Sequence, residues 1–116
     1  MTITDRTFVS FSGVFTLREG VSETDFLPAL HAFFRHFIEM GFATEYRIMR
    51  REALDGFGKT LPAFDYRGEL IYPDLAREQA AYEYVRQRSG RVHALHVAMN
   101  CMVKRDADFF LETRIA

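Results

Sequence analysis

Two histidines near the C-terminal end are the residues of this chain best suited to acid–base chemistry. His93 and His96 are three residues apart, a spacing that brings both side chains to one side of a helix. A metal site needs at least a third ligand, and the sequence contains neither an HxxxH nor a CxxC pattern. We therefore predict no metal site and no cofactor. His96 shares an apolar stripe with Met99 and Val103, which makes it the better candidate for a cleft histidine acting as an acid or base. The alternative is a hydrogen-bonded histidine of the core.

Hydroxyl groups and charged side chains supply the other candidates. Tyr66 is a weaker candidate for a catalytic base. Four tyrosines could line a cleft between a sheet and helices, although tyrosines also serve as packing material: Tyr46, Tyr66, Tyr72 and Tyr82. Asp65 and Arg67 flank Tyr66 and could bind a polar ligand or pair with each other structurally. The candidate ligand-binding set is therefore Tyr46, Arg47, Asp65, Tyr66, Arg67 and His96.

Other reactive residue types favour structure over chemistry. Cys101 is the single cysteine of the chain and, next to Met102, it is predicted to be a small buried hydrophobe. His31 and His36 are five residues apart, about 140° around a helix, so they cannot chelate one ion together. Both are expected at the surface or at its boundary. Residues 56–60 contain two glycines before a lysine and a threonine but lack the spacing of a phosphate-binding loop.

The elements that must position these residues follow from the period of the apolar side chains. Alternation with a period of two predicts four strands, over residues 7–18, 44–52, 63–72 and 108–115. Gly13 inside the first strand indicates a bulge or a close approach by a neighbouring backbone. From Ser22 to Gly41 the apolar residues recur at three- and four-residue steps. This pattern predicts a helix that Ser22 caps and Gly41 ends.

The second half of the chain contains the one ambiguous segment. Asp74 is predicted to cap a helix over residues 75–85, and residues 54–62 are predicted to form a turn-rich loop. Residues 91–103 fit a strand or a helix by periodicity. Their length, their alanines and their few β-branched residues favour a helix.

The order of elements predicts a single α+β domain over residues 1–116, a ferredoxin-like βαββαβ sandwich. Right-handed crossovers place the first and third strands in the middle of a four-stranded antiparallel sheet, with the helices on one face. By parity, the uncovered face carries charged residues such as Arg47 and Glu112 beside apolar ones such as Met49 and Phe110. We expect a homodimer through this uncovered face. The alternative is a solvated face with cross-strand ion pairs.

Composition excludes several classes of function. The 116 residues are 48% hydrophobic and 27% charged, which suits a folded domain with a filled core. A net charge of -1 argues against nucleic-acid binding. The start of the chain does not resemble a signal peptide, and no apolar run approaches the ~18 residues of a membrane helix. We therefore expect a cytoplasmic protein with neither nucleic-acid nor membrane partners.

Taken together, these features resemble the dimeric α+β barrel superfamily. The resemblance rests on the opening strand and glycine turn over residues 8–22, the phenylalanine-rich first helix and the closing residues 106–112. It is nearest to the stress-responsive (Dabb-type) barrels and more distant from the NIPSNAP-like and antibiotic-biosynthesis monooxygenase domains. Some catalytic relatives place a histidine at the start of the first strand, where this chain reads Arg6-Thr7-Phe8, and some use a tryptophan, which this chain lacks. No catalytic residue is therefore carried over.

The resemblance implies a homodimer with a small-molecule cleft between sheet and helices. Our leading hypothesis is a homodimeric barrel that binds a small, partly apolar molecule. The first alternative is a cofactor-independent monooxygenase, cyclase or isomerase that uses a cleft histidine or tyrosine as a base. The second is a structural or interaction module. Haem binding with His93 or His96 as axial ligand is a subordinate variant of the first hypothesis.

Overall fold

The computed structural model describes residues 8–52 and 64–115. Within them the elements run in the order β1 (Val9–Phe15), α1 (Glu23–Glu39), β2 (Glu45–Arg50), β3 (Tyr66–Tyr72), α2 (Leu75–Arg86), α3 (Gly90–Asn100) and β4 (Asp108–Thr113). This order confirms the predicted arrangement of strands and helices, although the strands are shorter than their alternating patterns. The loop predicted over residues 54–62 lies outside the described residues.

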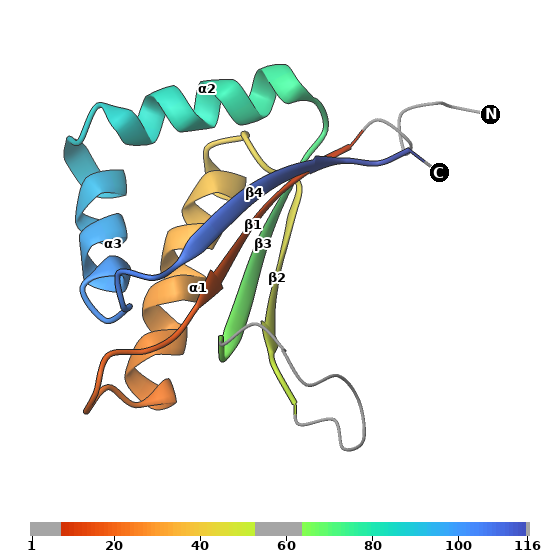
Figure 1. Cartoon of the computed structure of the whole chain (residues 1–116). Coiled ribbons are helices and arrows are strands. Elements are labelled where there is room, and N and C mark those ends of the chain that lie inside the picture. Colours follow the sequence, from red (N-terminus) through yellow and green to blue (C-terminus); the bar gives the residue numbers. More distant parts are fainter. Residues whose placement is uncertain (1–7, 53–63, 116) are drawn as a thin grey trace.

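The strands form one antiparallel sheet in the order β2-β3-β1-β4. The first and third strands are therefore central, as predicted. Figure 1 shows α1, α2 and α3 on the same side of this sheet, which leaves the other face uncovered. The register is continuous and sets Gly13 directly opposite Gly68, so Gly13 does not mark a bulge. The ferredoxin-like α+β fold is confirmed.

Helix α1 begins and ends where its sequence predicts. The Ser22 hydroxyl accepts a hydrogen bond from the Asp25 backbone N–H at 3.3 Å and donates one to the Asp25 carboxylate at 3.1 Å, which caps the first turn of the helix. Gly41 follows the helix with φ +79°, a left-handed conformation that glycine adopts without strain. The apolar stripe of α1 is buried against the sheet, through Phe26, Leu30, Phe33, Phe34 and Phe37.

Residues 91–103 are helical over most of their length, as the sequence analysis favoured. Helix α3 buries Val92 and Met99 and packs alongside α1. It ends at Asn100, and Val103 then forms an isolated bridge with Leu17. Helix α2 is capped by Asp74, whose carboxylate accepts the Arg77 backbone N–H at 2.8 Å. Among the helices that the structure describes, none combines the length and the apolar character needed to cross a membrane.

Two predictions about single side chains are wrong. His36 is only 6% exposed, because α2 places the Tyr84 hydroxyl 2.9 Å from its Nε2 atom and covers this side of α1. Cys101 is exposed at the C-cap of α3, where its thiol donates a hydrogen bond to the Ala98 carbonyl. The helix ends before Cys101, so the apolar stripe of α3 does not continue through it. His31 is exposed, as predicted.

The two serine caps give a matched test of helix capping. Ser22 makes a side-chain hydrogen bond to the first turn of α1, whereas Ser89 precedes α3 without such a bond. We expect Ser22→Ala to lower the free energy of unfolding by about 1 kcal/mol, and Ser89→Ala to lower it clearly less. Urea denaturation of both variants measures this difference. Equal losses would show that the Ser22 hydrogen bond contributes nothing specific.

Candidate functional site

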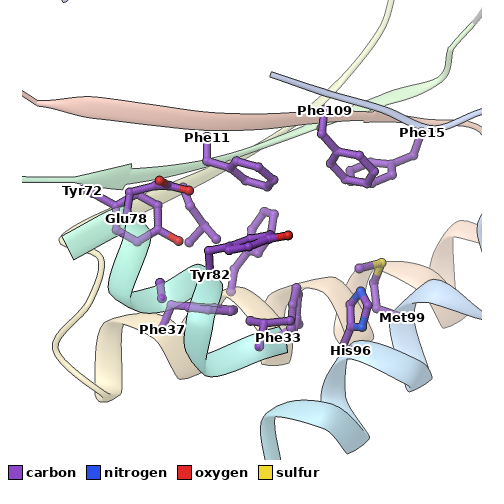
Figure 2. A pocket seen from close by; sticks show the side chains of 15 residues that line it. Phe11, Phe15, Phe33, Phe37, Tyr72, Glu78, Tyr82, His96, Met99 and Phe109 are labelled. Atoms are coloured by element: carbon purple, nitrogen blue, oxygen red, sulfur yellow. The ribbon is translucent and has the colours of Figure 1, made fainter. Parts of the chain in front are cut away.

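A cavity of about 270 Å³ lies between the sheet and the helices. Figure 2 shows its two walls, with phenylalanines of the sheet on one side and side chains of the helices on the other. The lining is mostly aromatic and comes from every helix and from three of the strands. It consists of Phe11, Gly13, Phe15, Phe33, Phe34, Phe37, Leu70, Tyr72, Glu78, Ala81, Tyr82, Val85, His96, Met99 and Phe109.

Two paired glycines shape the wall that the sheet provides. A Cβ atom at Gly13 would lie 2.7 Å from Phe15 Cζ and 2.9 Å from Phe109 Cε1. At Gly68 it would lie 2.8 Å from the ring of Phe34. These separations are shorter than van der Waals contact, so the rings lie directly over backbone that carries no side chain. The close approach predicted at Gly13 exists, but aromatic rings make it and not a neighbouring backbone.

The rings of the sheet wall also pack against one another. Phe109 stacks on Phe11 with ring centroids 5.8 Å apart and meets Phe15 edge-on at 5.9 Å. Such geometries stabilise an aromatic cluster beyond the burial of area alone. Phe109 nevertheless stays 53% exposed, because it belongs to the edge strand β4. The sheet wall is therefore ordered by ring packing, and it is open to solvent at the β4 edge.

His96 lies at one side of the cavity, against the helical wall. Its ring centroid is 5.3 Å from that of Phe33, with the two planes tilted by 34°. Burial lowers the pKa of His96 below its usual value, and the positive charges of His93 and Arg88 lower it further. Within the described residues no protein group hydrogen-bonds to its imidazole. At neutral pH His96 is thus a neutral imidazole, able to accept a proton or a hydrogen bond.

The opposite side of the cavity carries an acid and two tyrosines. Figure 2 shows Glu78 beside Tyr72 and near Phe11, well separated from His96. Burial raises the pKa of Glu78, and burial together with the nearby Glu78 charge raises the pKa of Tyr72. Tyr82 is 61% exposed, with its ring lying between the two walls. The cavity is therefore an apolar slot with a neutral base on one side and a desolvated carboxyl group on the other.

Of the six residues in the candidate ligand-binding set, the structure brings His96 alone into this cavity, and of the four tyrosines predicted to line a cleft it brings in Tyr72 and Tyr82. Tyr66 lies nearer α1, where its hydroxyl donates a hydrogen bond to Glu23 at 3.0 Å. Burial is the main cause that raises the pKa of Tyr66, and the hydrogen bond to the Glu23 carboxylate raises it further. The Tyr46 hydroxyl is hydrogen-bonded to His31 at 2.8 Å. Asp65 is exposed just before β3. A role for these residues in binding stays a prediction.

The two arginines of that set lie on the uncovered face of the sheet, as parity predicts. Arg67 donates a hydrogen bond to the Ser12 hydroxyl at 3.2 Å and lies 3.7 Å from the carboxylates of Glu69 and Glu112. Arg47 lies 3.7 Å from Glu69. Both the cross-strand ion pairs and the mixed polar character expected for this face are present.

Sequence reasoning missed two contributors to the cavity. Glu78 falls in the first turns of α2, where an acidic residue is usually explained by the helix dipole. The alternation over residues 108–115 had placed Phe109 on the inner face, but nothing local indicated that its ring would cover Gly13. Gly13 was the residue from which this contact could have been inferred, because a glycine inside a strand often marks a place where another group packs closely against the backbone.

The sequence from residue 9 to residue 111 matches the model of a family of unknown function, DUF6614. The chain belongs to this family. None of the curated proteins matches this DUF6614 sequence significantly.

Solved structures share the fold of this DUF6614 chain at low sequence identity. SnoaB, a cofactor-independent oxygenase from Streptomyces nogalater, is 13% identical with a TM-score of 0.69, and the match covers 95% of each chain. A Dabb family protein from Mesorhizobium loti is 12% identical with a TM-score of 0.61, over 95% of this chain and 99% of the other. A dimeric ferredoxin-like protein of unknown function from Thermobifida fusca is 8% identical with a TM-score of 0.61, over 92% and 91%. The resemblance to dimeric α+β barrels is thus confirmed at the level of the fold.

The lowered pKa of His96 predicts a specific loss of stability in acid. Above its usual value of 6.5 the imidazole is neutral in both the folded and the unfolded chain. Below it the unfolded chain binds the proton more readily, so the folded state loses stability as the pH falls. We expect His96→Gln to lose less unfolding free energy than the parent chain between about pH 7.5 and about pH 5.

Urea denaturation at the two pH values measures this loss. His93→Gln is the control, because it leaves His96 in place and removes only a secondary cause of the shift, so it should keep most of the parent's loss. An identical pH dependence in the parent and in His96→Gln would contradict the assignment.

Proposed function

We propose that the protein is a homodimer that binds a small, partly apolar molecule in the cavity between the sheet and the helices, with residues 1–116 acting as one domain. The cavity itself carries this proposal. Its volume of about 270 Å³ is close to the lower end of ligand pockets, which suits a molecule of one or two rings. Aromatic walls with a few polar groups on either side are the usual design of such a pocket.

Packing alone is a poor explanation of this cavity. The cavity opens to solvent beside Phe109 and Tyr82, which are 53% and 61% exposed. A concave apolar hollow that water can enter, lined by aromatic rings and a few polar groups, is the usual form of a small-molecule site. A chain with 12 phenylalanines has ample material to fill the space. The volume left beside Ala81, which lines the cavity, therefore favours a ligand over imperfect packing and over a purely structural or interaction module.

A second candidate function is general-base catalysis by His96. The observation that favours it is a neutral imidazole, without a hydrogen-bonding protein group among the described residues, at an apolar cavity. Such a base can take a weakly acidic proton from a bound substrate. Proton abstraction of this kind would serve the alternative of a cofactor-independent monooxygenase, cyclase or isomerase, and SnoaB, a cofactor-independent oxygenase, shares the fold. Fold likeness does not choose among these reactions.

The uncovered sheet face supports the proposed homodimer. Met49 and Phe110 are 55% and 40% exposed there, beside the ion pairs that Arg67 makes with Glu69 and Glu112. Apolar groups next to balanced charges suit a self-complementary two-fold contact. The Thermobifida fusca neighbour, which has the same fold, is described as dimeric.

Blocking the cavity tests the binding function. Ala81 is buried at the cavity and Ala80 is exposed on the same helix, so the two alanines form a matched pair. We expect Ala81→Leu to weaken binding of the neutral fluorescent probe N-phenylnaphthylamine by about tenfold or more, because the added carbons occupy the space of the probe. Ala80→Leu should bind the probe like the parent chain. Fluorescence titration measures both affinities.

A second blocking variant guards against a folding defect in the first. Val85 also lines the cavity, and Val85→Phe adds bulk from a different turn of α2. Circular dichroism shows whether each variant keeps its helices. A folded variant of either kind that binds the probe as tightly as the parent contradicts the proposed site. Failure of the parent itself to bind overturns the binding function.

The dimer interface has its own matched pair. Phe110 on the uncovered sheet face and Val97 on α3 are both exposed apolar residues. We expect Phe110→Lys to weaken self-association by about tenfold or more, since it places unpaired charge in the interface. Val97→Lys should leave self-association unchanged. Sedimentation velocity across a range of concentrations measures this, and a parent chain that stays monomeric at micromolar concentration would remove the homodimer.

A further inference from the structure

Glu78 differs electrostatically from the other residues of the cavity. Among the described residues that line it, Glu78 is the one with a side chain that is charged at neutral pH in water. No ion-pair partner for its carboxylate exists within the described part of the chain. By contrast, Glu23 forms an ion pair with Arg50, and Glu69 one with Arg67.

Partly removing the unpaired Glu78 carboxylate from water costs solvation free energy, and no protein cation among the described residues offsets it. Partial burial disfavours its charged form and raises its pKa. The neighbouring hydroxyl of Tyr72 is itself held in its neutral form by burial and by the Glu78 charge. A cation bound beside Glu78 would reverse this cost, because an opposite charge at close range favours the carboxylate.

The rings beside Glu78 favour the same kind of ligand. Figure 2 shows Phe11, Tyr72 and Tyr82 around the Glu78 side of the cavity. The negative face of an aromatic ring attracts a cation, more strongly where water is excluded. No lysine or arginine lines the cavity among the described residues, so a carboxylate or phosphate ligand would be repelled by Glu78 and would find no cationic partner there. His96 is neutral at neutral pH and does not oppose a cation.

We propose that the cavity selects a small amine with an aromatic or otherwise apolar body, whose ammonium group donates hydrogen bonds to the Glu78 carboxylate. The apolar body then lies between the sheet wall, at Phe11 and Phe109, and the helical wall, at Phe33. This inference rests on the proposed binding function and adds the charge of the ligand to it. Glu78 is the residue that determines specificity, and His96 faces the far end of the bound molecule.

Three ligands of nearly the same shape separate charge from fit. Naphthylethylamine, naphthylethanol and naphthylacetate carry a positive, a neutral and a negative group on the same double ring. At neutral pH and low salt we expect the amine to bind about tenfold more tightly than the alcohol, and the carboxylate to bind more weakly than both. Isothermal titration calorimetry on the full chain measures all three affinities.

The matched variants are Glu78→Gln in the cavity and Glu83→Gln on the outer side of the same helix. Glu83 is exposed and pairs with Arg86, so its variant removes one negative charge from α2 without touching the cavity lining. We expect Glu78→Gln to remove the preference for the amine, so that the variant binds the amine no more tightly than the alcohol. Glu83→Gln should keep the order of affinities of the parent chain.

The outcomes distinguish this inference from the function on which it rests. Equal binding of amine and alcohol by the parent, or an amine preference that survives Glu78→Gln, overturns the role of Glu78 and leaves the binding function intact. Tighter binding of the carboxylate also overturns it. Binding of none of the three ligands overturns the binding function together with the inference.

Discussion

The close approach of aromatic rings to the two central strands is the constraint on which the rest of this structure depends. Gly13 and Gly68 are paired across β1 and β3, and a side chain at either position would meet a ring at less than 3 Å. Phe34 of α1 lies over Gly68, and Phe109 of β4 lies over Gly13. The same pair of glycines therefore sets how closely α1 approaches the sheet and where the edge strand directs its ring.

The cavity follows from this arrangement. Beyond the rings that cover the two glycines there is open space, and the side chains of α2 and α3 border that space without filling it. His96 and Glu78, on opposite sides of the cavity, respond to its low polarity in opposite directions, since burial lowers the pKa of His96 and raises that of Glu78. Packing and electrostatics in this site therefore have one origin, which is an aromatic cluster packed over two glycines of the central strands.

The local sequence pattern was sufficient to predict a strand or a helix wherever one face of that element packs against the core. Each strand showed its alternation and α1 its stripe, and residues 91–103 resolved correctly as a helix because composition added to an ambiguous period. His36 and the cavity were not predictable in this way. His36 is buried because α2, which is distant in sequence, packs against this side of α1 and places Tyr84 beside it. The residues that neighbour His36 in the sequence do not indicate where α2 will pack. The same holds for Tyr46 and Tyr66, which point to the correct face of the sheet but lie under α1, away from the cavity.

The two faces of β1 carry different kinds of side chains. Ser10 and Ser12 join the ion-pair network of the uncovered face, while Phe11, Gly13 and Phe15 line the cavity on the other side. Structures that share this fold at 8 to 13% identity include an oxygenase and a protein of unknown function, so the scaffold tolerates exchange of nearly all its side chains. Chemistry on such a scaffold must then come from the few polar groups that face the cavity. In this chain those groups are an uncommitted imidazole and an unpaired carboxylate on opposite sides of an aromatic slot, an arrangement that core packing alone does not require.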